Sequence, residues 1–83
     1  MSASRVLSTL KRSIMTRANK SEFGEVSSVD VRNVGRNSVS GPERGGLVAS
    51  AFKQLVSEGQ LVKTTSRVLN RDTRSRVSVY ILA

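Results

Sequence analysis

The sequence predicts an α+β domain in which amphipathic helices come first and a two-stranded β-hairpin follows. Two long stretches before residue 60 place their apolar residues three or four positions apart, which is helical spacing. After Gly59 the spacing changes to alternation and β-branched residues become frequent, as in strands. A length of 83 residues, with no internal repeat and no linker-like segment, predicts one domain, 1–83.

Helix 41–58 is the most clearly marked element. Ser40 is a favourable N-cap, and Glu43 stands three residues later, where it completes a capping box. Pro42 falls in the first turn, where a missing N–H group costs nothing, and Gly59 suits the left-handed residue that ends a helix. Such a helix is predicted to be central to the core. Its apolar stripe consists of Leu47, Val48, Ala51, Phe52, Leu55 and Val56.

Two glycines, Gly45 and Gly46, lie in the first turns of this helix. A glycine inside a helix costs about 0.5–1 kcal/mol relative to alanine, so a pair needs a compensating reason. One reason is close packing against another helix, or a regular helix that begins nearer Leu47. The other is a close approach of the backbone to a phosphate at the positive end of the helix. The sequence leaves both open.

The N-terminal stretch predicts a helix at 4–20. It is rich in Arg and Ser and has no acidic residue, a composition that is also typical of a mitochondrial transit peptide. We expect a core helix and a cytoplasmic protein instead, because the rest of the chain has too few apolar faces to close a core. The apolar stripe of this helix is Val6, Leu7, Leu10, Ile14 and Ala18.

The segment between the two long helices is less regular. Phe23 is expected to plug the core where the chain leaves the first helix, and Val26 is expected in a short bridging strand. A short helix is predicted at 28–34 and ends at Gly35, although its three valines are weak helix formers. The polar turn 36–40 then leads into helix 41–58.

The hairpin is predicted at 60–82, with its turn at 71–74. Its register is not determined, because the turn lacks the Asn-Gly or Asp-Gly pair that would fix it. The last strand is apolar up to the end of the chain and is able to pair with another copy, so a homodimer through this strand is one expectation. Four basic residues gather toward the tip of the hairpin: Arg67, Arg71, Arg74 and Arg76.

The charge balance favours a polyanionic partner. Fourteen Lys and Arg against six Asp and Glu give a net charge of +8, and the pI is 11.4. A pI above about 9 is typical of nucleic-acid-binding domains. Attraction to an anionic membrane surface, or a basic surface that only keeps the protein soluble, would also account for this charge.

The same composition argues against catalysis. The chain has no Cys and no His, which excludes a disulfide framework, a Cys/His zinc site, a Cys nucleophile and a His base. It has no phosphate-binding loop motif, and it has no apolar run of about 18 residues that would span a membrane. We therefore expect no enzyme, no cofactor, no metal, no small-molecule substrate and no membrane association.

The order of elements is helix, short strand, helix, turn, longer helix and basic-tipped hairpin. Over about residues 4–82 this order resembles the winged-helix variant of the helix-turn-helix DNA-binding domain. The run AFKQLVSEGQLVKT (51–64) is similar to the end of a recognition helix that leads into the first strand of the wing. In such domains Phe52, Leu55 and Gly59 are core or turn positions. Small basic versions of this fold occur in bacteriophages and other mobile elements.

The resemblance implies a three-helix winged helix-turn-helix with a two-stranded C-terminal wing. Its third helix would enter the major groove of double-stranded DNA, and the wing would contact the backbone or the minor groove. It also implies largely sequence-tolerant binding, in transcription regulation or in replication or recombination of a phage or mobile element, and hence in the host cytoplasm if the protein is viral. The expected DNA-contacting residues are Arg36, Ser38, Ser40, Arg44, Gly46, Ser50, Lys53, Gln54, Ser57, Arg67, Arg71, Arg74 and Arg76.

Two other functions stay open. Winged helices also bind structured RNA, although this chain lacks the aromatic platforms on which single-stranded bases stack. Alternatively, the polar face of helix 41–58 or the hairpin edge docks a partner protein, and the chain is an adaptor.

Overall fold

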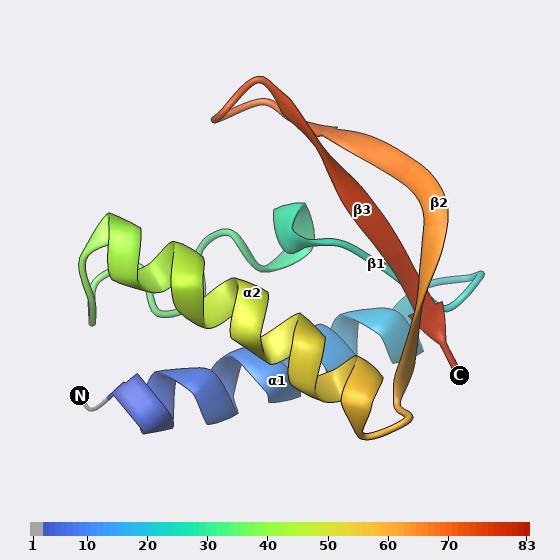
Figure 1. Ribbon diagram of the computed structural model, residues 1–83, viewed down its shortest axis with the longest axis horizontal. Helices are drawn as coiled ribbons and strands as arrows, with labels where there is room; N and C mark the ends of the chain where they lie inside the picture. Colours follow the sequence, from blue (N-terminus) through green and yellow to red (C-terminus); the bar gives the residue numbers. More distant parts are fainter. Residues whose placement is uncertain (1–2) are drawn as a thin grey trace.

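The computed structural model describes residues 3–83, so the first two residues of the predicted domain lie outside it. Two helices pack beside a three-stranded antiparallel sheet, which confirms the α+β class (Figure 1). The helices and the 3₁₀ helix are α1 (Ala3–Lys20), α2 (Gly41–Ser57) and η1 (Ser28–Val31). The strands are β1 (Glu25–Val26), β2 (Leu61–Asn70) and β3 (Ser75–Leu82).

The core lies where α1, α2 and the inner end of the sheet meet. Residues four positions apart on α1 form a fully buried row, because they recur on one face of the helix. The predicted stripe of α2 is also confirmed for the most part, although Val56 is 38% exposed. The buried residues of the two helices are Val6, Leu10, Ile14, Ala18, Val48, Ala51, Phe52 and Leu55.

The sheet fixes the register that the turn sequence left open. β3 is the central strand: Val26 pairs with Tyr80 on one side, and Leu61 pairs with Leu82 on the other. Tyr80 and Ile81, near the end of β3, therefore have a paired strand on each side. The edges that stay open are β2 and the Ser75–Val79 part of β3.

A homodimer through the last strand, as predicted, would therefore need the Ser75–Val79 part of β3, and β2 offers the other open edge. Along β2, Lys63 and Arg67 place like charges on the strand, and a bulge interrupts it between them. Charge and bulges on an edge strand oppose pairing with another strand. Among the described residues, β2 is thus the protected edge, and the Ser75–Val79 part of β3 is the less protected one.

The helix predicted at 28–34 is replaced by the short 3₁₀ helix η1 and by turns through residue 38. Asp30 folds back so that its Oδ2 accepts a hydrogen bond from the N–H group of Ser27 (2.8 Å). A short segment that is rich in valine does not nucleate a regular helix well. Ordering the backbone of the first turn costs more conformational free energy than its single hydrogen bond returns.

The prediction for Phe23 is wrong, since its side chain is 73% exposed. The chain turns at Gly24, whose φ of 69° lies in the left-handed region. A Cβ added at Gly24 would lie 3.3 Å from Cδ1 of Leu82, so the neighbouring side chain that packs at this corner is Leu82.

Candidate nucleic-acid interface

The cations of the helices are partly neutralised within the protein. Lys11 on α1 forms a 2.6 Å ion pair with Glu58, just after α2. Arg17, near the end of α1, lies 3.6 Å from Asp30 in η1. These contacts join elements that are far apart in sequence. We interpret them as part of the scaffold, by which we mean α1, η1, α2 and the inner end of the sheet.

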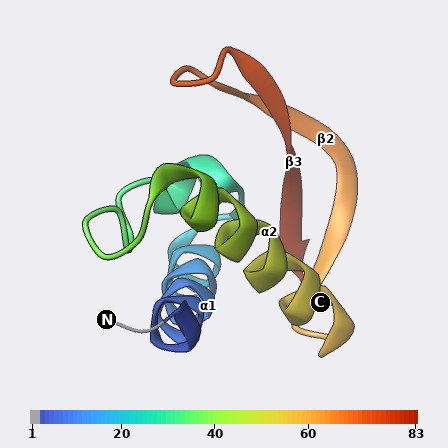
Figure 2. The ribbon, with the colours of Figure 1, turned by 60° about the vertical axis from the view of Figure 1, so that its left-hand side comes forward.

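The outer part of the hairpin, residues 64–78, is called the wing below. It bends at a bulge in β2, because Lys63 pairs with Tyr80 but the next pair is Arg67 with Ser78. The hydroxyl of Thr64 donates to the carbonyl of Val79 (2.7 Å) and accepts from the N–H group of Ser66 (3.2 Å). These bonds satisfy backbone groups where the ladder is interrupted. Figure 2 shows the result: the hairpin rises above the helices and its turn bends back toward η1.

The turn of the wing is held by its own side chains. The N–H group of Asp72 donates to Oδ1 of Asn70 (3.0 Å), and the hydroxyls of Thr73 and Ser75 lie 2.6 Å apart. Arg74 has a φ of 56°, which is uncommon for a residue other than glycine. The turn thus has a defined backbone, and Arg71 and Arg74 extend from it into solvent.

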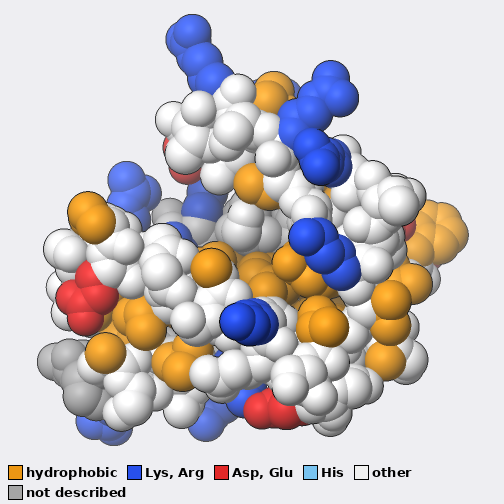
Figure 3. Space-filling model, in the orientation of Figure 1, with side chains coloured by type: hydrophobic (Ala, Val, Ile, Leu, Met, Phe, Trp, Pro, Cys, Tyr) orange, Lys and Arg blue, Asp and Glu red, His pale blue; other side chains and the backbone are white. Residues whose placement is uncertain are grey.

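The two strands of the wing place two more arginines on one face. Arg67 is opposite Ser78 and Arg76 is opposite Leu69, so strand alternation puts Arg67 and Arg76 on the same side. Arg76 and Ser78 line the groove between β3 and α2, and Tyr80, on the same side of β3, stacks on Phe52 of α2, so this side of β3 faces α2. Figure 3 shows the basic side chains gathered over the hairpin.

The outer face of α2 is polar and has short side chains. Gly46, Ser50, Lys53 and Ser57 are exposed there, and Gln54 is half-buried. A Cβ added at Gly45 or Gly46 would meet no atom within 4 Å. Close packing of helix against helix therefore does not explain the two glycines, and neither does a later start of the helix, because α2 begins at Gly41.

A groove runs between α2 and the wing. Its floor is apolar, and it includes Val48 and the stacked rings of Phe52 and Tyr80, whose centroids are 4.5 Å apart. At the start of α2 it widens into a cleft of about 410 Å³, which we call the arginine cleft. Three cations line this cleft, and they are Arg32, Arg36 and Arg44.

Arg44 is fixed by the backbone that it supports. Its Nε donates to the carbonyl of Val34 (2.8 Å), and its Nη2 donates to the carbonyl of Val31. Burial, and then the nearby charge of Arg36, lowers the pKa of the Arg44 guanidinium below its ordinary value. Arginine nevertheless stays protonated in proteins, so Arg44 contributes its charge to the cleft while it caps the end of η1 and the turn after it.

The residues predicted from the sequence divide into four groups. Arg36, Arg44 and Arg76 line the groove, Arg67 shares the face of Arg76, and Arg71 and Arg74 are at the wing turn. The α2 residues form its outer face. Ser40 has a structural task, because its Oγ accepts from the N–H group of Glu43 (3.3 Å), and Ser38 lies exposed in the preceding turn.

Sequence reasoning missed Arg32, which lines the arginine cleft beside Arg36. No local signal marks it, because its place in the cleft depends on the wing bending back over the start of α2. Sequence reasoning also missed Lys63, which pairs with Tyr80 just before the bulge and is exposed.

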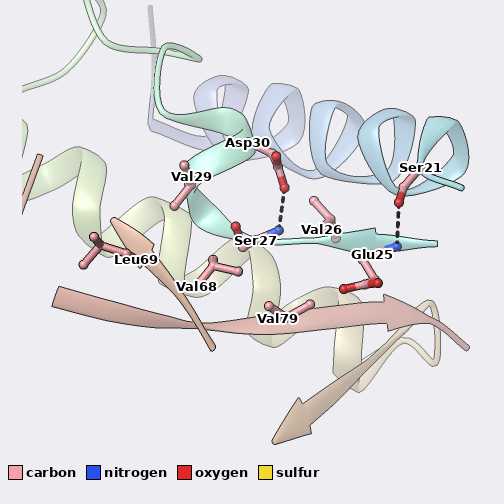
Figure 4. A pocket seen from close by; sticks show the side chains of 9 residues that line it. All are labelled: Ser21, Glu25, Val26, Ser27, Val29, Asp30, Val68, Leu69 and Val79. Carbon is pink, nitrogen blue, oxygen red and sulfur yellow. Dashed lines mark hydrogen bonds between the residues drawn. The ribbon is translucent and has the colours of Figure 1, made fainter. Parts of the chain in front are cut away.

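A second hollow lies between the hairpin and β1–η1, and its charge is of the opposite sign (Figure 4). Its charged side chains are Glu25 and Asp30. The polar groups are used internally: Ser21 Oγ accepts from the N–H group of Glu25 (3.1 Å), and Asp30 accepts from that of Ser27. Arg17 lies 3.6 Å from Asp30, and the adjoining hollow over η1 is lined by Arg17, Arg32 and Arg71, so the charge on this side of the hairpin is mixed.

Comparison of the chain with protein-family models, with curated proteins and with solved structures finds no match. Within residues 3–83, no three side chains of His, Cys, Asp or Glu gather to hold a metal ion. Neither helix of this described part combines the length and the apolar character needed to cross a membrane.

Proposed function

We propose that this protein is a winged-helix domain that binds double-stranded DNA, with α2 in the major groove and the wing on the adjacent backbone or minor groove. The observation that carries the proposal is the cationic surface formed by the wing and the arginine cleft beside a helix with short side chains. Within residues 60–82, five cations stand against one acid, Asp72. The net charge of +8 adds a long-range attraction to any polyanion.

The arrangement of elements supports this proposal. A helix, a short strand, a helical turn, a second long helix and a hairpin follow in order, and only the inner end of β3 is flanked by both β1 and β2. The outer part of the hairpin is therefore able to project beside α2 as a wing. In this interpretation η1 and the turns after it stand in the place of the second helix of the motif.

The outer face of α2 fits a close approach to DNA. The major groove is about 12 Å wide and admits a helix, and short side chains let the backbone come near the base edges. Lys53 is the one cation on this face, and Gln54 lies beside it. Gln54 suits adenine and Lys53 suits guanine or a phosphate. With so few base-reading groups on α2, most of the affinity is expected from phosphate contacts and is sequence-tolerant.

The first test is the salt dependence of binding to duplex DNA. If about five to seven phosphates are neutralised, the logarithm of the binding constant falls against the logarithm of salt concentration with a slope of roughly −5 to −6. A fluorescence-anisotropy titration at several salt concentrations measures this slope. Absence of duplex binding at low salt would end the proposal.

The second test separates the wing from the rest of the charge. Arg71→Glu with Arg74→Glu is expected to weaken binding to all duplexes by roughly 10- to 100-fold. The matched control is Arg12→Glu with Lys20→Glu on α1, which changes the net charge equally but away from the groove. Equal losses of DNA affinity in the two double variants would mean that the net charge of the protein, and not the wing, accounts for the binding.

A third test concerns the helix. Lys53→Ala with Gln54→Ala is expected to change the preference among duplex sequences more than the mean affinity, because base contacts specify and phosphate contacts position. Competition with structured RNA in the same titrations decides between the two nucleic acids. If structured RNA displaces the duplex DNA more readily than competing DNA does, RNA becomes the proposed partner.

A further inference from the structure

The arginine cleft lies where three separate segments meet. Gly41, Arg44 and Gly45 come from the first turns of α2, Arg32 and Arg36 come from the turns after η1, and Asn70, Asp72 and Thr73 come from the wing turn. The cleft therefore exists only while the wing is bent over the start of α2. Anything bound in it contacts both the scaffold and the wing.

The cleft holds more positive charge than it can neutralise internally. It contains three guanidinium groups and one carboxylate, that of Asp72. Arg36 is close enough to Arg44 that its charge contributes to the lowered pKa of Arg44, after the larger effect of burial. Crowded like charges are unfavourable, and an anion between them relieves this repulsion.

The arginines of the cleft are not equally available to a ligand. Arg44 already donates to the carbonyls of Val31 and Val34, so it is a positioning residue for the wall of the cleft. Arg36 has one long contact to Asn33 (3.5 Å), and the Arg32 side chain is 55% exposed. Arg32 and Arg36 therefore have donors to offer.

Asp72 already places an anion at this site. Its Oδ2 lies 4.0 Å from Nη1 of Arg32, at the outer limit of an ion pair, and its side chain is 62% exposed. A contact this long and this exposed is weak and readily exchanged. It joins the wing to the scaffold, whereas the ion pairs of Lys11 and Arg17 lie within the scaffold.

We propose that the arginine cleft binds one phosphate group of the DNA backbone, and that Asp72 occupies part of this site in the free protein. On binding, the phosphate replaces the Asp72 carboxylate at Arg32, and the wing turn is released to follow the DNA backbone. This inference rests on the proposed function and adds a regulatory contact to it. Asp72 lowers the affinity for DNA by competing with the phosphate, as an internal substitute for it.

The test is a double-mutant cycle on duplex binding. Asp72→Asn keeps the size of the side chain and the backbone bond to Asn70, and we expect it to tighten binding by about two- to five-fold, since exposed ion pairs are weak. In an Arg32→Gln background the gain is expected to shrink, because the partner that Asp72 occupies is gone. Glu22→Gln, an equal change of charge in the exposed turn after α1, is the control for the overall field.

A second readout does not need DNA. Inorganic phosphate is titrated into the wild-type protein and into the Asp72→Asn variant, and the backbone amide signals of residues 32, 36 and 72 are followed by NMR. We expect saturable shifts at these positions, with tighter binding in the variant. Shifts that do not saturate, or that spread evenly over the basic surface, would overturn the site.

The outcomes separate this inference from the proposed function. If the wild-type protein binds no duplex at low salt, both are wrong. If it binds duplex but Asp72→Asn gives the same gain as Glu22→Gln in both backgrounds, only the exchange at Arg32 is wrong. If the gain of Asp72→Asn disappears specifically in the Arg32→Gln background, the exchange is supported.

Discussion

The scaffold and the wing are built on opposite principles. In the scaffold, formed by α1, η1, α2 and the inner end of the sheet, apolar rows are buried and cations such as Lys11 and Arg17 pair with acids. In the wing, none of residues 64–78 is buried, and four arginines stand with one acid. The scaffold thus supplies stability, whereas the wing carries charge without a buried side chain of its own.

Under the proposed function, this difference predicts that folding and DNA binding are separable in this chain. Surface substitutions usually change stability by less than about 0.5 kcal/mol, so wing variants are expected to fold normally and to bind less. Substitutions in the buried row of α1 are expected to do the reverse. The arginine cleft is the place where the two regions meet and where the separation can fail.

The largest effect is expected in the scaffold. Leu10→Ala removes a fully buried side chain in the row between the helices and is expected to cost about 2–5 kcal/mol of unfolding free energy. Urea denaturation followed by circular dichroism measures it. The matched control is Leu69→Ala in the wing, where the leucine is 55% exposed and little loss is expected. Similar losses at both positions would break the division into scaffold and wing.

Arg44 tests the boundary between the regions. Arg44→Gln leaves the carbonyls of Val31 and Val34 without their charged donor, and about 1–2 kcal/mol of stability is expected to be lost. Arg44→Lys is the control, because it keeps the charge but cannot reach both carbonyls in the same fork. If both variants lose stability and DNA affinity together, although Arg44→Lys keeps the charge, Arg44 acts by positioning. Unchanged stability in Arg44→Gln would mean that its main role is contact with the ligand.

Local patterns were sufficient to predict most of the scaffold. The stripes of α1 and α2 follow from spacing, and the ends of α2 follow from Ser40 and Gly59. The failures have non-local causes. The segment 28–39 is shaped by Arg44, which lies 10 and 13 residues after the carbonyls that it holds, and the bulge depends on a bond from Thr64 to Val79, 15 residues away.

The candidate site was predictable to a similar extent. The arginines of the hairpin tip are close in sequence, so their clustering was visible without a structure. Arg32 was not visible as a cleft residue, because its position depends on the wing bending back over the start of α2. Phe23 shows the opposite error, in which an apolar residue was assumed to be buried although the turn at Gly24 leaves it in solvent.

The smallest effect is expected at Gly46, and it has opposite signs for folding and for binding. A Cβ at this position meets no atom within 4 Å, so Gly46→Ala is expected to stabilise α2 by about 0.5–1 kcal/mol. If the helix backbone lies against DNA, the same methyl group separates the two surfaces, and duplex binding weakens several-fold. Thermal unfolding and anisotropy titration measure the two effects on one sample.

Ser8→Ala on the exposed side of α1 is the control for Gly46→Ala, because it also favours the helix but lies outside the groove. We expect that control to gain stability and to bind DNA as the wild type does. A Gly46→Ala variant that is more stable and binds equally well would show that α2 does not approach DNA closely. The short side chains of its outer face would then have a different cause, and the wing alone would account for binding.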